Sequence, residues 1–339
     1  MKFKRQLTAL AFAMAAGSSF AQLVVGVSYD TFQEERWKRD EAAMKGEIEK
    51  GGGKYIMSDA GESAEKQIAD IDGLIAKGAK VLVILAKDKD AIMPAINKAA
   101  QLKIPVISYD RLFEAPGVTY MTFDNKEVGR MTARAILAVK PKGNFAIIKG
   151  DPGDSNANFL REGQAEVLAD AIKKGDVKIV GEEYTPSWKP ENAQKNMEQI
   201  LVKNGNKVDA VIAQNDGMAG GVVAALTSKG LKNVPVSGQD GDFAALNRVA
   251  LGTQTVSVWK NSTDLARAAG KAALELGAGK PVTGAADWSG GPKKVTMKSI
   301  FLKPIPITRD NLDVVLTAGH IKKAELCKGV TDAKVTACK

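Results

Sequence analysis

Polar and aromatic side chains recur directly after short apolar runs that have the composition of β-strands. Asp30 to Trp37 follow the first run, and Tyr109-Asp110-Arg111 follow the fourth. Later groups are rich in Asp, Asn, Arg, Gln, Lys and Trp; they lie at 150–158 with Arg161, and at 184–188, 214–216, 238–242 and 259–260. A sugar hydroxyl both donates and accepts, so carboxylates and amides can accept from it while Arg and Lys donate to it. Trp37, Trp188 and Trp259 offer flat surfaces for the apolar faces of a sugar ring. This inventory predicts a polyol-binding site.

Other kinds of chemistry have little support in the sequence. The chain has one His and two Cys, all close to its C-terminal end, so metal sites and thiol or imidazole catalysis are not expected in its body. The glycine-rich stretches lack the spacing of phosphate-binding loops, and no G-x-S-x-G elbow is present. The net charge of +9 is spread along the 339 residues and does not require a nucleic-acid partner. We therefore expect no catalytic residue, no metal and no cofactor.

Each of these residues also has an ordinary structural interpretation. A single Asp or Asn after a strand, such as Asn125 or Asp216, is more often a helix N-cap than a ligand contact. A lone Trp more often belongs to a core than to a binding platform. Only the coincidence of many such residues at strand ends favours binding.

The elements that must position these residues alternate along the chain. Strands are predicted at 23–28, 54–57, 81–85, 105–109, 118–122, 144–148, 177–180, 210–213, 235–237 and 255–258. Helical spacing lies between most of them, at 34–50, 63–76, 91–101, 125–139, 158–173, 191–203 and 218–229. Strands this apolar are covered on both faces, and alternating βα units form doubly wound parallel sheets. The predicted fold class is α/β.

A weak internal repeat indicates two similar halves. Residues 80–86 lead through a helix to 104–110, and residues 207–213 lead through a helix to 234–240. In each half an Asp, Asp110 or Asp240, falls six residues after the apolar residue that precedes a proline, although two βαβ units can resemble each other by chance. We expect a hinge near 123–125, 259–260 and 294–302. The predicted lobes are 22–124 with 260–293 and 125–259 with 294–320, followed by a polar tail at 321–339.

The two ends of the chain point to an extracytoplasmic protein. Residues 1–21 have a basic head, an apolar stretch at 7–16 and small residues before position 22, which predicts a secretory signal cleaved after Ala21. An amphipathic first helix is the alternative interpretation. In an oxidising periplasm, Cys327 and Cys338 can form a disulfide, or they remain free thiols.

The ordered set of motifs resembles the pentose/hexose periplasmic binding proteins that serve ABC importers. The motifs are Glu35-Arg36-Trp37, Tyr109-Asp110-Arg111, Phe123-Asp124-Asn125, Pro190-Glu191-Asn192-Ala193, Asn215-Asp216 with Ala219-Gly220-Gly221, Ser237-Gly238-Gln239-Asp240 and Gly252-Thr253-Gln254-Thr255. The resemblance covers nearly the whole mature chain. The sequence departs from the family pattern at 86–88, at 151–153 and in the Cys-containing tail.

This resemblance implies a sugar enclosed between two Rossmann-like lobes joined by a multi-strand hinge. The implied sugar contacts are Arg36, Asp110 and Arg111 in the first lobe, Asn158, Arg161, Trp188, Asn215 and Asp240 in the second, and Lys260 at the hinge. Several polar residues compete for the assignments within 154–158. The implied ligand is D-xylose, with ribose, arabinose, glucose and galactose as alternatives. The implied partners are a membrane ABC permease and a chemoreceptor, and a monomer is expected.

Two other functions are weighed against this one. A sugar-sensing regulator would need an N-terminal helix-turn-helix, and the predicted signal occupies that place. A sugar-modifying enzyme would need a nucleophile and base or a cofactor loop, and neither is found in the sequence.

Overall fold

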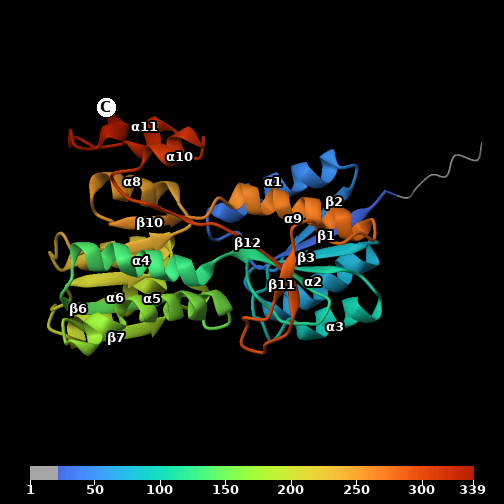
Figure 1. Cartoon of the computed structure of the whole chain (residues 1–339), viewed down its shortest axis with the longest axis horizontal. Coiled ribbons are helices and arrows are strands. Elements are labelled where there is room, and N and C mark those ends of the chain that lie inside the picture. Colours follow the sequence, from blue (N-terminus) through green and yellow to red (C-terminus); the bar gives the residue numbers. More distant parts are fainter. Residues whose placement is uncertain (1–21) are drawn as a thin grey trace, which may run out of the picture.

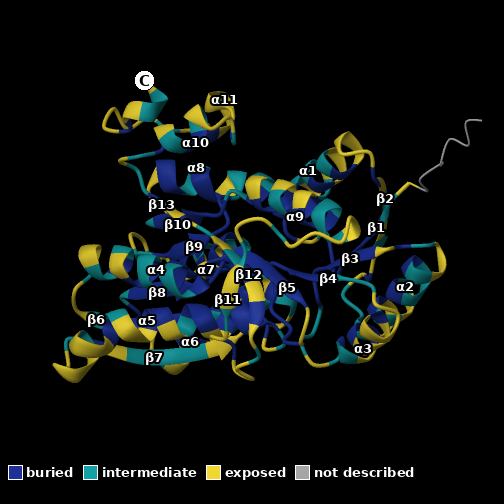
Figure 2. Ribbon diagram, turned by 45° about the vertical axis from the view of Figure 1, so that its right-hand side comes forward, coloured by how far each residue is buried: buried dark blue, intermediate teal, exposed yellow. Residues whose placement is uncertain are grey.

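Two α/β lobes lie side by side in the computed structural model, which describes residues 22–339 (Figure 1). The predicted signal at 1–21 lies outside the described residues. The sheet interiors are buried, whereas exposed residues gather on the outer faces of helices and in loops (Figure 2). The predicted α/β fold class is confirmed.

The first lobe is built on a seven-stranded sheet in the order β11-β12-β5-β4-β3-β1-β2. All neighbouring strands are parallel except β11 and β12. The strands are β1 (Val24–Tyr29), β2 (Lys54–Asp59), β3 (Val81–Ile84), β4 (Val106–Tyr109), β5 (Thr119–Phe123), β11 (Ala286–Trp288) and β12 (Met297–Leu302). The helices are α1 (Arg36–Lys50), α2 (Ala64–Ala76), α3 (Met93–Gln101) and α9 (Ser262–Gly277).

The sequence of β3 shows why this sheet is covered on both faces. Its side chains alternate, so that Val81 and Val83 pack in a core with α1 and α9, while Leu82 and Ile84 pack in a core with α2 and α3. Figure 1 shows the two helix pairs on opposite sides of the sheet. Four apolar residues in succession therefore serve two cores.

The second lobe contains two three-stranded sheets, β7-β6-β8 and β13-β10-β9, joined by a bridge between Val211 and Val236. Its strands are β6 (Gly143–Lys149), β7 (Val177–Tyr184), β8 (Ala210–Ala213), β9 (Ser237–Gln239), β10 (Val256–Trp259) and β13 (Ile305–Ile307). Its helices are α4 (Asn125–Val139), α5 (Ser155–Lys173), the short η1 (Pro186–Trp188), α6 (Pro190–Lys203), α7 (Asp216–Ser228) and α8 (Phe243–Leu251).

Three chain crossings connect the lobes, and one of them differs from the prediction. The chain crosses between β5 and α4, between β10 and α9, and between β12 and β13. The sequence placed 294–320 in the second lobe, but β12 pairs with β5 in the first sheet from Lys298 with Thr119 to Leu302 with Phe123. The crossing therefore falls after Leu302. The local pattern could not show this boundary because it depends on a strand partner far away in the sequence.

The chain after β13, which includes the predicted tail at 321–339, packs against the second lobe. It contains α10 (Asp313–Thr317), α11 (Lys323–Leu326) and η2 (Thr336–Cys338). Leu312, Val315 and Leu326 share a core with Leu246 of α8 and with Trp259. Cys327 and Cys338 are joined by a disulfide. This disulfide-linked segment therefore packs over α8.

Helices begin directly after several strands because a polar residue at each junction acts as an N-cap. Asp124, Asp154 and Asn215 accept hydrogen bonds from the backbone N–H groups of Glu127, Asn156 and Met218. These caps hold the strand ends at the interface between the lobes.

Candidate functional site

A small, partly open cavity lies where the carboxyl ends of strands from both lobes meet, as ligand sites do in open α/β sheets. The side chains of its wall leave only about 20 Å³ free between them. Its lining comes from both lobes and consists of Glu34, Arg36, Trp37, Asp110, Arg111, Asp154, Asn156, Trp188, Asn215, Gln239, Asp240 and Lys260. Every one of these residues has polar side-chain atoms, and two are tryptophans.

Arg36 lies at the centre of one charge network in this wall. Its side chain is only 2% exposed, and Nη2 lies 2.9 Å from Asp110 Oδ2 and 3.3 Å from Asp40 Oδ2. Nη1 donates to Asp240 Oδ1 across the interface at 3.4 Å. The guanidinium lies over the Trp37 ring, 4.3 Å from its centroid. Arg36 therefore contacts carboxylates of both lobes.

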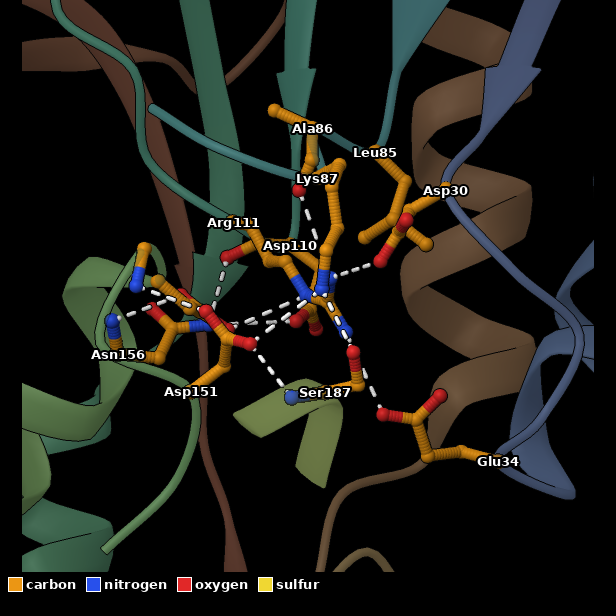
Figure 3. A network of polar contacts seen from close by, with 12 residues as sticks. Asp30, Glu34, Leu85, Ala86, Lys87, Asp110, Arg111, Asp151, Asn156 and Ser187 are labelled. Atoms are coloured by element: carbon orange, nitrogen blue, oxygen red, sulfur yellow. Dashed lines mark hydrogen bonds and ion pairs between the residues drawn. The ribbon is translucent and has the colours of Figure 1, made fainter. Parts of the chain in front are cut away.

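Arg111 organises a second network beside the first (Figure 3). Its Nη1 donates to Asp30 Oδ2 at 2.6 Å, and Nη2 donates to Glu34 Oε1 at 3.3 Å. Its Nε lies 3.1 Å from Asp154 Oδ2 in the second lobe. Asn156 adds a neutral bridge, donating from Nδ2 to the backbone oxygen of Asp110 at 3.2 Å. Both arginines thus link the lobes through buried ion pairs.

Asp110 and Asp240 occupy matching positions in the two halves. Each has a positive φ, 61° and 99°, which is uncommon for a residue with a side chain. Each donates its backbone N–H to the neighbouring strand, Asp110 to the oxygen of Met121 and Asp240 to that of Val258. The internal repeat therefore reflects the same local backbone geometry in both lobes.

Asp216 holds the loop that carries Asp240 through hydrogen bonds to the loop backbone. Oδ2 of Asp216 accepts from the backbone N–H groups of Gly241 and Asp242 at 2.9 and 3.0 Å. Gly241 has a φ of 75° and lies against the Trp259 ring, so a Cβ there would collide with the indole. Lys260 Nζ lies 2.9 Å from Asp240 Oδ1. The Asp240 carboxylate is consequently held at a fixed place in the wall.

Burial and the two arginines set the ionisation of the cavity. Burial alone would raise the pKa of Asp110, but Arg36, with Lys260 and Arg111, holds it below its ordinary value. Burial raises the pKa of Asp154 to about 6 despite its contact with Arg111. Burial also raises the pKa of Glu34. The wall therefore contains both a firmly ionised carboxylate, Asp110, and a carboxyl group, Asp154, that takes up a proton in mildly acidic solution.

Seven of the nine sugar contacts implied by the resemblance line this cavity, and two do not. Asn158 is exposed and accepts a hydrogen bond from Tyr184 at 2.7 Å, while Arg161 Nε donates to Glu182 at 3.0 Å. The reason is the start of α5 at Ser155, which places Asn156 at the cavity. Asn158 lies about 200° further round the helix, since successive residues turn by about 100°. Asp154 and Asn156 replace Asn158 and Arg161 in the wall.

The assignment also missed Glu34, Trp37 and Gln239, which line the cavity. All three belong to the polar groups after predicted strands, so the sequence contained a signal for them. For Asn156 the signal was Asp154, because an N-cap at Asp154 starts the helix at Ser155 and so places Asn156 in its first turn.

Among residues 22–339, no group of three or more His, Cys, Asp or Glu side chains has an arrangement that could hold a metal ion. In the same range, no helix is both long and apolar enough to cross a lipid bilayer. The wall of the cavity thus combines carboxylates, cationic donors and indole rings.

A family model described as periplasmic binding protein domain matches residues 25–281. The D-xylose-binding periplasmic protein of Escherichia coli (strain K12) is 37% identical over 308 residues, covering 90% of this chain and 93% of that protein. A protein with the same description from Haemophilus influenzae is 37% identical over 331 residues, covering 96% of this chain and 99% of that protein.

A solved structure shares the fold. It is an ABC transporter solute binding protein from Clostridium phytofermentans with bound β-D-glucose, 28% identical, with a TM-score of 0.81. The match covers 89% of this chain and 99% of that one.

Proposed function

This chain belongs to the periplasmic binding protein domain family, and from that membership we propose that it captures a monosaccharide, D-xylose in the first place, for a membrane ABC permease. Proteins of this family are transport receptors, so the chain is a binding protein and not an enzyme. The predicted resemblance to sugar-binding members is confirmed.

The observation that carries the proposal is the pairing of fixed acceptors and donors across the cavity. Asp110 and Asp240 contribute carboxylates from opposite lobes, with Arg36 between them. A hydroxyl that accepts from the guanidinium and donates to a carboxylate satisfies both groups. Hydrogen bonds to charged partners contribute about 1.5 to 3 kcal/mol each, so a few of them suffice for tight binding of a small ligand.

The indole rings of the wall suit a sugar ring. The free space between the walls is only about 20 Å³ in this structure, so a sugar enters when the lobes move apart. Trp37 and Trp188 supply apolar surface for the C–H groups of the ring. Among single sugars, D-xylose is favoured because two relatives at 37% identity are described as D-xylose-binding. Ribose, arabinose, glucose and galactose remain the alternatives.

Hinge closure supplies the mechanism. A sugar that contacts both lobes does so only in the closed form, and this difference in affinity drives closure. The three crossings near Asp124, Lys260 and Lys303 confine the motion to a hinge. The mature chain acts in the periplasm as a monomer. There the permease recognises its closed surface, and a chemoreceptor is the second recipient in this proposal.

A thermal-shift screen across a dozen monosaccharides tests this proposal. A ligand that binds only the folded protein stabilises it by about 2.7 kcal/mol at a concentration 100 times its Kd. We expect D-xylose to raise the melting temperature of the mature chain by several degrees, and more than any other sugar does. A larger shift with another monosaccharide would correct the ligand. No shift with any sugar would contradict the function.

A further inference from the structure

An interlobe contact outside the cavity joins Lys87 to Asp151 and Ser187. Lys87 follows β3 in the first lobe, and the other two residues follow β6 and β7 in the second. Lys87 Nζ lies 3.3 Å from Asp151 Oδ2 and donates to Ser187 Oγ at 3.0 Å. Figure 3 shows the lysine side chain reaching toward both partners. The side chains of Lys87 and Asp151 are 15% and 11% exposed, so water screens this pair less than a surface pair.

The base of Lys87 is fixed within the first lobe. Its backbone N–H donates to Oε1 of Gln67 at 2.8 Å. Gln67 is fully buried and donates from Nε2 to the backbone oxygen of Leu85 at 2.7 Å. The direction in which Lys87 extends is therefore set by α2 and by the end of β3.

On the other side, Asp151 stabilises the turn that carries Trp188. Its Oδ2 accepts from the backbone N–H of Ser187 at 2.5 Å. Ser187 and Trp188 both have a φ of 56°, so two consecutive residues with side chains adopt the left-handed region. Gly150 lies under the indole of Trp188, and a Cβ at that position would collide with the ring. The turn depends on outside anchors, and Asp151 is one of them.

We propose that Lys87 is a positioning residue for ligand binding, which acts through Asp151 and Ser187 to fix the Trp188 ring when the lobes close. The inference rests on the proposed function. Because the contact spans the two lobes, opening of the hinge breaks it, and its main effect is to slow release of the ligand. The segments that meet here are 86–88 of the first lobe and 151–153 of the second.

The test is the rate of D-xylose release, or of the sugar that ranks first in the screen, followed by stopped-flow tryptophan fluorescence. Lys87→Met removes the charge and keeps most of the side-chain length. We expect about a tenfold faster dissociation, the size of one charge-assisted hydrogen bond, with little change in association. Asp151→Asn releases sugar at least as fast as Lys87→Met, because it also loses an acceptor for the backbone N–H of Ser187 or Gly153, and the double variant is no faster than Asp151→Asn alone. Lys87→Arg keeps the positive charge, and we expect it to release sugar nearly as slowly as the wild type does.

The matched control is Lys142→Met, since Lys142 pairs with Asp176 at 2.8 Å within the second lobe and is largely exposed. We expect it to release sugar at the wild-type rate. We also expect the unliganded melting temperature of Lys87→Met to match that of the wild type, because the open form lacks the contact.

Three results would overturn the inference. These are a dissociation rate of Lys87→Met within twofold of the wild type, an equal acceleration in Lys142→Met, or additive effects of Lys87→Met and Asp151→Asn. A wild-type protein that binds no monosaccharide would contradict the proposed function itself, and the inference with it. Normal wild-type binding with unaltered release from the variants would contradict the inference alone.

Discussion

At the scale of single residues, Arg36 pairs with carboxylates of its own lobe as well as with Asp240 of the other lobe. The carboxylates of its own lobe are those of Asp40 and Asp110, and all three side chains are buried. Arg36→Ala leaves two buried carboxylates without their partner, a change that typically costs about 3 to 5 kcal/mol. We expect Arg36→Ala to lower the unliganded melting temperature as well as sugar affinity. Differential scanning calorimetry with unchanged unfolding would contradict this account of the network.

The pKa of Asp154 predicts a pH dependence. Burial raises it to about 6 in the closed form, and in a hydrated open cleft we expect it near its ordinary value of about 3.9. Closure therefore takes up protons between about pH 4 and 6, so this group makes affinity rise as pH falls through that window. Burial of Glu34 acts in the same direction.

Titration calorimetry at pH 5 in two buffers of different ionisation enthalpy measures this uptake. We expect net proton uptake on sugar binding in the wild type and a smaller uptake in Asp154→Asn. Net proton release at pH 5 would show that the sign is wrong.

At the scale of elements, the first turn of α5 decides which asparagine faces the cavity. Asn156 bridges to Asp110 and lines the cavity, whereas Asn158 bonds to Tyr184 on the surface. We expect Asn156→Ala to weaken sugar binding about tenfold or more, as loss of a buried polar partner does. Asn158→Ala is the matched control and should bind as the wild type does. Equal effects of the two substitutions in calorimetric titrations would refute the placement of this turn.

The elements also show how far the sequence could lead. Alternating apolar runs predicted the strands because covered parallel strands such as β3 are apolar throughout. Local pattern predicted neither the partner of β12 nor the side of α5 that faces the cavity. The partner of β12 is β5, which lies far away in the sequence. The side of α5 that faces the cavity depends on where the helix starts, because a shift of two residues turns the opposite side toward the cavity. The strand-end residues of the site were recognisable because each such position contributes to the same edge of a sheet.

At the scale of the whole molecule, the disulfide-linked C-terminal segment over α8 is a separate stabilising device. The disulfide between Cys327 and Cys338 closes a short loop, and by the chain-entropy model this contributes about 2 to 3 kcal/mol. We expect the Cys327→Ser/Cys338→Ser variant to melt at a lower temperature while binding sugar with wild-type affinity. A large loss of affinity at 25 °C would instead link the tail to the cavity. One route for such a link is His320, whose Nε2 lies 2.7 Å from the backbone oxygen of Gly241, beside Asp240, and whose ring centroid lies 5.2 Å from that of Trp259.

Closure of two lobes over one sugar ring is the central claim, and Asp240 is its clearest test. This carboxylate faces Arg36 of the other lobe and Lys260 at the hinge, and the cavity includes all three. The decisive measurement is calorimetric titration of D-xylose into the wild type, Asp240→Ala and the surface control Asp176→Ala. We expect tight 1:1 binding to the wild type and the control, with affinity for Asp240→Ala lowered at least a hundredfold. Unaltered binding to Asp240→Ala would contradict the account.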